Sequence, residues 1–216
     1  MTLANDSATL PATGTVVATH LANSMEYQAM VLADAGGHIV GTRDAYRLFV
    51  PSSAVGANKV FFDLFNASGS GVGLRLVQAR VFPNLDTAVT GTLGIQAYLT
   101  RTSTIGTGGT ASTTEGTSLT AATISKLDPG AATLNTSITA RLAPTGGATA
   151  GALIGHASFF TEETNAGAAV AAALGGDFLK DSGYDIVISE GTGCRVVQGS
   201  VASVGNVVFV FDFVLA

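Results

Sequence analysis

Asp212 is the residue of greatest chemical interest in this sequence. It interrupts an apolar, β-branched and aromatic run at the end of the chain, residues 205–216. A carboxylate buried in such a run needs a cationic partner, because burying an unpaired charge is costly. We expect Arg75, Arg80 or an arginine of another subunit to supply that charge. We therefore interpret Asp212 as one half of a structural ion pair and not as a catalytic group.

The histidines do not have the spacing of a metal site or a catalytic triad. His20, His38 and His156 lie far apart, and none has a second histidine or a cysteine at zinc-ligand spacing. Ser158 stands close to His156, but the chain contains no G-x-S-x-G nucleophile elbow. We expect no bound metal and no catalytic residues.

Glu162 and Glu163 are the most suggestive pair of carboxylates. Adjacent residues on a strand point to opposite sides, so these two cannot converge on one bond as the paired carboxylates of glycosidases do. We expect one of them to cap a short connector helix over Thr164–Leu174, which Gly175 and Gly176 would end.

The segment Gly106–Ala111 formally matches the G-x-G-x-x-A variant of the dinucleotide-binding fingerprint. The polar residues that follow it, 112–116, do not form an amphipathic helix whose N-terminus could face a pyrophosphate. We expect no cofactor. Cys194 is the single cysteine, which excludes an intrachain disulfide, and we interpret it as a small buried apolar residue.

These residues must be positioned by strands, because apolar residues recur mainly with period two and turn residues separate the runs. The closing run places Val207, Phe209, Phe211, Phe213 and Leu215 on one face of a strand and Val208, Val210, Asp212 and Val214 on the other. We expect both faces of this strand to be covered. The other expected strands are 46–50, 59–65, 74–82, 86–100, 119–124, 133–142, 152–160, 184–189 and 195–198. A glycine-rich turn predicts that 59–65 and 74–82 form a hairpin. The pattern indicates an all-β fold, a β-sandwich of jelly-roll or similar Greek-key type.

The start of the chain differs from the rest. Residues 1–45 form an expected N-terminal arm and leading segment, and residues 46–216 the sandwich domain. Between residues 16 and 30 the pattern fits a strand or a helix, and both remain open. Residues 1–11 lack the basic region and apolar core of a signal peptide, and no apolar run reaches the length of a membrane span.

The composition is unusual in its low charge. Charged residues make up 12% of the chain, against about 25% in an average globular protein. Such a surface must be covered by threonine, serine and glycine or buried against other chains. The net charge of -5, with arginines and lysines scattered along the sequence, argues against a nucleic-acid partner.

Several segments of the sequence resemble those of a known class of protein. They are residues 57–71, 98–109, 140–151, 160–165 and 188–199, and the last of them leads to the apolar closing strand. Over most of residues 46–216 the chain resembles small virion structural proteins of tailed bacteriophages. The resemblance implies a non-enzymatic capsid decoration or cement protein located in the virion. Such a protein would form a homo-oligomer, of which a trimer is one form, and would bind the major capsid protein without nucleic acid or membrane.

Two other functions stay open at this point. A tail or fibre adhesin would bind host surface glycan through the loops rich in threonine and glycine, although the chain lacks tryptophan and its four tyrosines are dispersed. A hydrolase would need a site built from loops, and no residue pattern indicates one.

Overall fold

The computed structural model divides the chain into two compact units, Met1–Arg43 and Asp44–Ala216. It describes three strands of the first unit by their backbone. In the second unit it describes residues 44–84, 93–116, 121–161, 175–180 and 185–216. The boundary falls two residues before the predicted one. The expected connector helix at Thr164–Leu174, together with Glu162 and Glu163, lies outside the described residues.

The first unit contains an antiparallel sheet of three strands. These are β1 (Ala8–Thr9), β2 (Val16–Ala22) and β3 (Met25–Ala29), and β2 lies in the middle. His20 is paired with Tyr27 across β2 and β3. The segment that fitted a strand or a helix is therefore a pair of strands. This agrees with the β-branched residues at the start of β2, which favour extended backbone.

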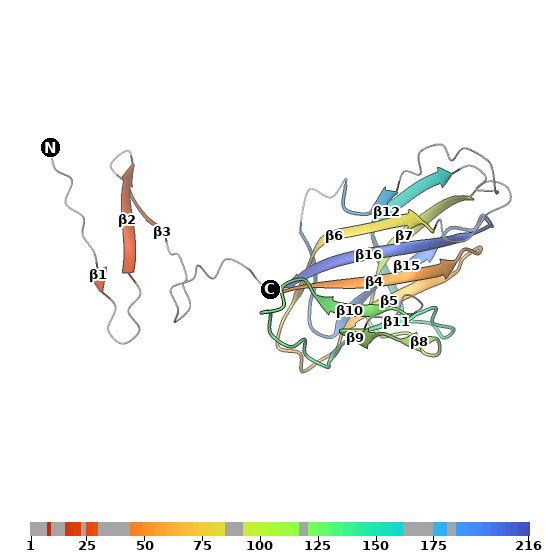
Figure 1. The fold of residues 1–216 in the computed structure, drawn as a ribbon, viewed down its shortest axis with the longest axis horizontal. Coiled ribbons are helices and arrows are strands. Elements are labelled where there is room, and N and C mark those ends of the chain that lie inside the picture. Colours follow the sequence, from red (N-terminus) through yellow and green to blue (C-terminus); the bar gives the residue numbers. More distant parts are fainter. Residues whose placement is uncertain are drawn as a thin grey trace. The chain divides into compact units, whose positions relative to one another are not determined.

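The second unit is a β-sandwich, as predicted, and its described residues contain no helix. One sheet has the order β13-β6-β16-β4-β10-β9, with β14 also paired to β6, and the other has the order β12-β7-β15-β5-β11-β8 (Figure 1). The first sheet consists of β4 (Ala45–Ala54), β6 (Leu74–Pro83), β9 (Thr113–Thr114), β10 (Thr123–Lys126), β13 (Gly176–Asp177), β14 (Ile186–Ile188) and β16 (Asn206–Leu215). The second consists of β5 (Val60–Asn66), β7 (Leu93–Thr102), β8 (Thr110–Ala111), β11 (Ile138–Leu142), β12 (Ala150–Thr161) and β15 (Thr192–Gln198).

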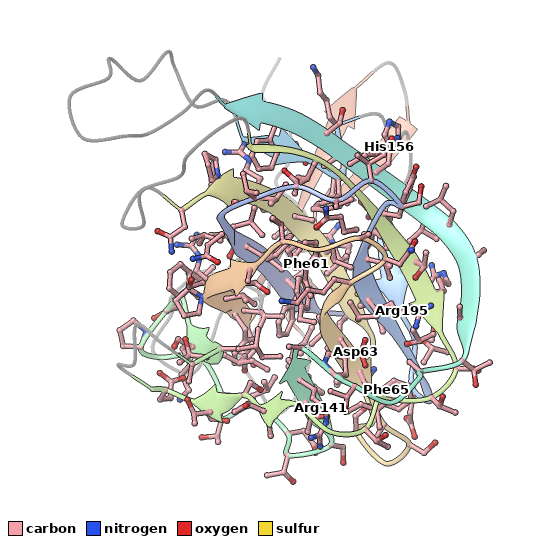
Figure 2. The ribbon with its side chains drawn as sticks, turned by 90° about the vertical axis from the view of Figure 1, so that its right-hand side faces the viewer. Phe61, Asp63, Phe65, Arg141, His156 and Arg195 are labelled. Carbon is pink, nitrogen blue, oxygen red and sulfur yellow. The ribbon has the colours of Figure 1, made fainter. Side chains whose placement is uncertain are left out.

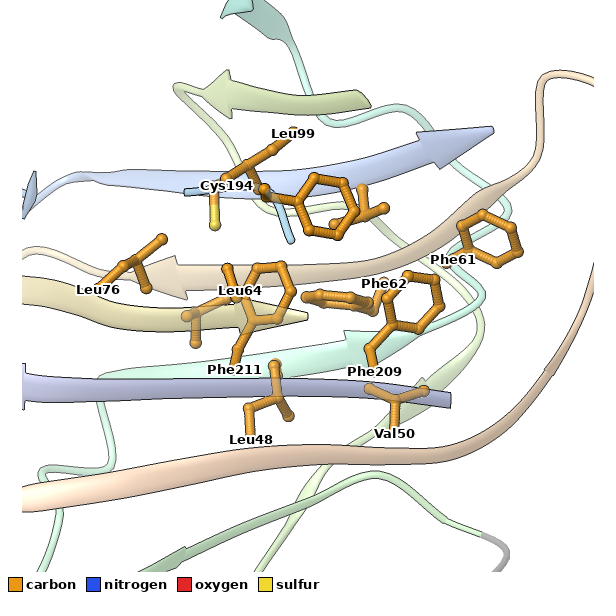
Figure 3. Close-up of a cluster of buried hydrophobic side chains, with 14 of the residues drawn as sticks. Leu48, Val50, Phe61, Phe62, Leu64, Leu76, Leu99, Cys194, Phe209 and Phe211 are labelled. Carbon is orange, nitrogen blue, oxygen red and sulfur yellow. The ribbon is translucent and has the colours of Figure 1, made fainter. Parts of the chain in front are cut away.

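The closing strand β16 is central to its sheet, between β6 and β4. Its residues Val207, Phe209, Phe211 and Phe213 are fully buried and face the second sheet, which confirms the predicted alternation. The ring of Phe211 meets that of Phe62 edge to face, with centroids 5.0 Å apart (Figure 3). Aromatic contacts of this kind add to the apolar burial that holds the two sheets together.

The opposite face of β16 is not covered evenly. Val208 and Val210 are half-buried, whereas Asp212 and Val214 are buried. The prediction that both faces are covered is therefore right for the last part of the strand and wrong for its first part. Neighbouring side chains of the same sheet, described below, cover the carboxylate.

The predicted hairpin between 59–65 and 74–82 is wrong, because β5 and β6 belong to different sheets. Strand β5 is already paired on both sides, with β15 and β11, and has no free edge for β6. The glycine-rich connection instead crosses from one sheet to the other. Gly69 and Gly71 have positive φ there, and the Asn66 side-chain amide donates to the carbonyl of Val72 at 2.7 Å.

Strand β4 also runs further than predicted. It continues through Pro51 to Ala54, although proline cannot donate a hydrogen bond to a neighbouring strand. The pairing of β4 with β16 has a bulge between Val207 and Phe209, opposite this position. On the other side, β10 is paired with β4 only as far as Phe49, so the ladder requires no amide from Pro51 there.

In the described part of the chain no helix is long and apolar enough to cross a membrane.

Candidate functional site

The candidate site is centred on Asp63, in the middle of β5. Asp63 lies between Arg141 on β11 and Arg195 on β15, and Arg195 is in turn paired with Thr100 on β7. Arg141, Asp63 and Arg195 form a row across the second sheet (Figure 2). The neighbours of Asp63 along the strand, Phe62 and Leu64, belong to the core, so Asp63 points away from it. Its exposed fraction is nevertheless only 1%.

Asp63 is buried because two loops cross the outer side of this sheet. We call residues 103–109 and 143–149 the strap loops. The backbone N–H of Gly106 donates to Oδ2 of Asp63 at 2.8 Å. The loops are joined to each other, since the amides of Thr145 and Gly146 both donate to the carbonyl of Thr107 at 3.0 Å. The strap loops therefore form a partial third layer above the carboxylate.

The two arginines hold the strap loops from below. Nη1 of Arg141 donates to the carbonyl of Gly108 at 2.8 Å, and Nη1 of Arg195 donates to the carbonyl of Ala148 at 3.3 Å. Each strap loop is thus fixed to the sheet by a charged side chain, and one of them also by Asp63. Hydrogen bonds to charged groups are stronger than neutral ones, so this attachment stiffens both loops.

The electrostatics indicate a structural carboxylate. Burial raises the pKa of Asp63, and the Gly106 amide and the positive charges of Arg195 and Arg141 offset part of that rise. Oδ1 of Asp63 and Nε of both arginines are buried without a hydrogen-bond partner within the protein. Because Asp63 is covered by the strap loops, it cannot reach a substrate in solution. The role of Asp63 is to hold the strap loops in place.

Asp212 forms the predicted structural ion pair, but with a different arginine. Nε of Arg47 donates to Oδ1 at 2.7 Å and Nη2 to Oδ2 at 2.8 Å, a two-pronged arrangement. The predicted partners are wrong: Arg75 pairs with Asp185 at 3.0 Å and Arg80 with Asp177 at 3.6 Å.

Register explains the choice of partner. Arg47 on β4 stands directly opposite Asp212, and on the other side the directly opposite residue of β6 is Gln78. With its amide nitrogen turned toward Asp212, Gln78 donates to Oδ2 at 3.1 Å and accepts from Nε of Arg80 at 3.3 Å. Arg80 therefore contacts Asp212 through Gln78 and not directly.

The remaining candidate residues do not converge. His156 and Ser158 are exposed on β12, while His38 lies outside the described residues. Over the part of the chain that the structure describes, no cluster of histidine, cysteine, aspartate and glutamate could hold a metal ion. Cys194 is fully buried in the core, as predicted, and burial raises the pKa of its thiol to about 12.

The segment Gly106–Ala111 is part of a strap loop and the short strand β8, and the strand β9 follows it where a nucleotide site would have a helix. Sequence reasoning did not identify Asp63, Arg141 and Arg195 as a group. The available signal was a carboxylate inside the apolar run Val60–Phe65, the same signal that drew attention to Asp212.

The two outer sides of the sandwich differ in charge. The three ion pairs found among the described residues all involve the first sheet: Arg47–Asp212, Arg75–Asp185 and Arg80–Asp177. Over the second sheet, the strap loops together with β8 and the start of β12, residues 103–111 and 143–153, contain no aspartate, glutamate, lysine, arginine or histidine. The charges below them, Asp63, Arg141 and Arg195, are buried or half-buried.

Comparison with protein families, curated proteins and solved structures found no match to this chain.

Proposed function

We propose that this chain is a non-enzymatic structural protein of a virus particle, a decoration or cement protein that forms homo-oligomers and binds the major capsid shell. The single observation that carries the proposal is the layer of uncharged strap loops that covers the outer side of the second sheet. A surface without charge, on a protein whose opposite side carries ion pairs, shares with the centre of protein interfaces their depletion of charged residues.

The proposal agrees with the chemistry of the polar clusters. Asp63 and Asp212 are the two buried aspartates of the described residues, and each is engaged in holding backbone or strands in place. Both therefore support the shape of the sandwich and neither is available as a general acid or base. Buried aspartates that hold backbone and strands in place are sufficient for a structural role.

The N-terminal unit supports attachment to a larger assembly. Its sheet has short strands of two, seven and five residues. Sheets of this size seldom have enough apolar surface to be stable alone. We propose that this sheet gains apolar burial by packing against a neighbouring subunit of a shell.

The test is binding to particles. Purified chain is mixed with shells assembled from the major capsid protein of the virus that encodes it, and bound protein is separated by sedimentation and located by cryo-electron microscopy. We expect saturable binding at fixed positions of the shell lattice. Failure to sediment with shells, together with absence from purified particles, would overturn the proposal. Binding to a glycan array in place of shells would support an adhesin.

A further inference from the structure

We infer that two buried water molecules lie between the second sheet and the strap loops and join Asp63 to Arg141 and Arg195. The residues Thr100, Arg195, Asp63 and Arg141 stand side by side on β7, β15, β5 and β11, and we call them the polar row. Directly paired residues of adjacent strands point to the same side of a sheet, so all four side chains face the outer side, where the strap loops lie. The inference concerns the inside of the protein and is independent of the proposed function.

Each member of the polar row has a buried side-chain atom without a hydrogen-bond partner within the protein. The described residues contain seven such atoms, and four of them belong to this row: Oδ1 of Asp63, Nε of Arg141, Nε of Arg195 and Oγ1 of Thr100. Buried polar groups in proteins are nearly always hydrogen-bonded, either to the protein or to ordered water. Because the unpaired atoms gather in one row, shared partners explain them better than four separate defects.

The charges of the polar row do not contact each other directly. Asp63 takes part in none of the ion pairs found in the described part of the chain. Nη1 of each arginine donates to a strap-loop carbonyl, that of Gly108 or Ala148. Opposite charges that are neighbours in a sheet and yet form no contact indicate a molecule between them.

The spacing of strands in a sheet suits a bridging water. Neighbouring strands lie about 4.8 Å apart, too far for a direct hydrogen bond between side-chain atoms at equal heights above the sheet. A water molecule that makes two hydrogen bonds of about 2.8 Å at a nearly tetrahedral angle joins atoms about 4.5 Å apart. One water on each side of Asp63 therefore matches the distance to the next strand.

The donors and the acceptor of the polar row select water over an ion. Between Asp63 and each arginine, one side offers an acceptor, Oδ1, and the other offers a donor, the Nε–H group. Water can donate to the first and accept from the second, whereas an anion would face a carboxylate and a cation would face a guanidinium group. Oδ1 can accept from both waters, and the hydroxyl of Thr100 can give the water beside Arg195 a third bond, the usual number for a buried water.

A high-resolution crystal structure of the full chain, from crystals soaked in sodium bromide, tests the inference directly. We expect two density peaks, each about 2.7 to 3.2 Å from Oδ1 of Asp63 and from Nε of Arg141 or Arg195. Neither peak should have the anomalous signal of bromide. A bromide peak at either place would show an anion site, and direct contact of Asp63 with both arginines would leave no place for water. Either result would overturn the inference.

In solution, magnetic relaxation dispersion of water oxygen-17 counts buried waters with long residence times. Asp63→Leu removes the acceptor and fills the space, so this count should fall by two relative to the wild-type chain. Arg141→Met and Arg195→Met each remove one donor, and each should lose at least the water on its own side. Unchanged counts in folded variants would contradict the inference.

Asp212→Leu is the matched control. It makes the same change in the other sheet, at a carboxylate that is bound directly by Arg47 through two hydrogen bonds. The count of buried waters should therefore stay at the wild-type value. A fall of two in this variant as well would show that the loss does not report on the polar row. Circular dichroism establishes which variants fold, and if Asp63→Leu does not, the two arginine variants and the wild-type crystal structure decide.

Discussion

Asp212 and Arg47 face each other across β16 and β4 and are joined by two hydrogen bonds, of 2.7 and 2.8 Å. The pair is asymmetric, because the carboxylate side chain is 10% exposed and the guanidinium side chain 41%. Removal of one partner therefore has different consequences for the other. Arg47 can turn toward water when it is left alone, whereas Asp212 cannot.

This asymmetry predicts that Arg47→Met destabilises the protein more than Asp212→Val. Arg47→Met leaves a buried carboxylate with Gln78 as its remaining side-chain partner, and we expect a loss of about 1 to 3 kcal/mol in the free energy of unfolding. Asp212→Val should cost less than about 1 kcal/mol, because valine suits a strand and the freed arginine is solvated. Urea denaturation of both variants measures the difference.

Arg75→Met provides the control for that comparison. Its partner Asp185 has a side chain that is 65% exposed, so the loss of this pair should change stability by less than about 0.5 kcal/mol. An Asp212→Val protein that is less stable than Arg47→Met would show that the carboxylate has a role in the sheet beyond the ion pair.

Asp63→Asn should stabilise the protein at neutral pH. Burial raises the pKa of Asp63 in the folded state above its value in the unfolded chain, so the ionised form costs folding free energy at every pH above the folded pKa. Asparagine removes that cost and can still accept a hydrogen bond from Gly106. The advantage of the variant should shrink as pH falls through the folded pKa and vanish below about 3.9, where the carboxyl is protonated in both states.

The measurement is the free energy of unfolding of both proteins at several pH values, compared as a difference so that other carboxylates cancel. An Asp63→Asn protein that is less stable than wild type at pH 7 would mean that Arg141 and Arg195 require the negative charge. Asp63→Leu, which removes the acceptor for Gly106, should cost about 1 to 3 kcal/mol and speed hydrogen exchange of the strap-loop amides.

Gly106→Ala should loosen the strap loop that it belongs to. A Cβ atom at this position would lie 2.2 Å from Oδ2 of Asp63 and 2.8 Å from Cβ of Pro144, so the loop would have to shift and lose its hydrogen bond to Asp63. We expect a loss of about 1 to 3 kcal/mol, seen as a lower thermal midpoint. Gly147→Ala is the control, because a Cβ there meets nothing within 4 Å and the change should be neutral or slightly stabilising. Equal effects of the two changes would show that the strap loop does not rest on Asp63.

Cys194 should be unreactive while the protein is folded. It is fully buried, and burial raises the pKa of its thiol to about 12, so almost no thiolate exists at pH 8. A thiol-specific chromogenic reagent should label it at the rate of unfolding in buffer and at once in denaturant. Rapid labelling of the native protein would place Cys194 at the surface and contradict the packing of β15 against the first sheet.

Local patterns in the sequence were enough to predict the β-class of the fold and the core face of the closing strand. Alternation is a local property of extended backbone, so the positions of Phe209, Phe211 and Phe213 on the core side could be predicted from the run that contains them. The same local reasoning indicated that Asp212 needs a partner and that Cys194 belongs to the core.

Which strands are neighbours and which charges form pairs could not be predicted from local patterns. The turn residues between β5 and β6 suit a hairpin and a crossing between sheets equally well. The connection is a crossing because both edges of β5 are paired, with β11 and β15. Asp63 acquires its environment from strands and loops far away in the sequence, and Asp212 acquires Arg47 through the register of β16 with β4. Register depends on how whole layers pack, and no short segment of sequence contains that information.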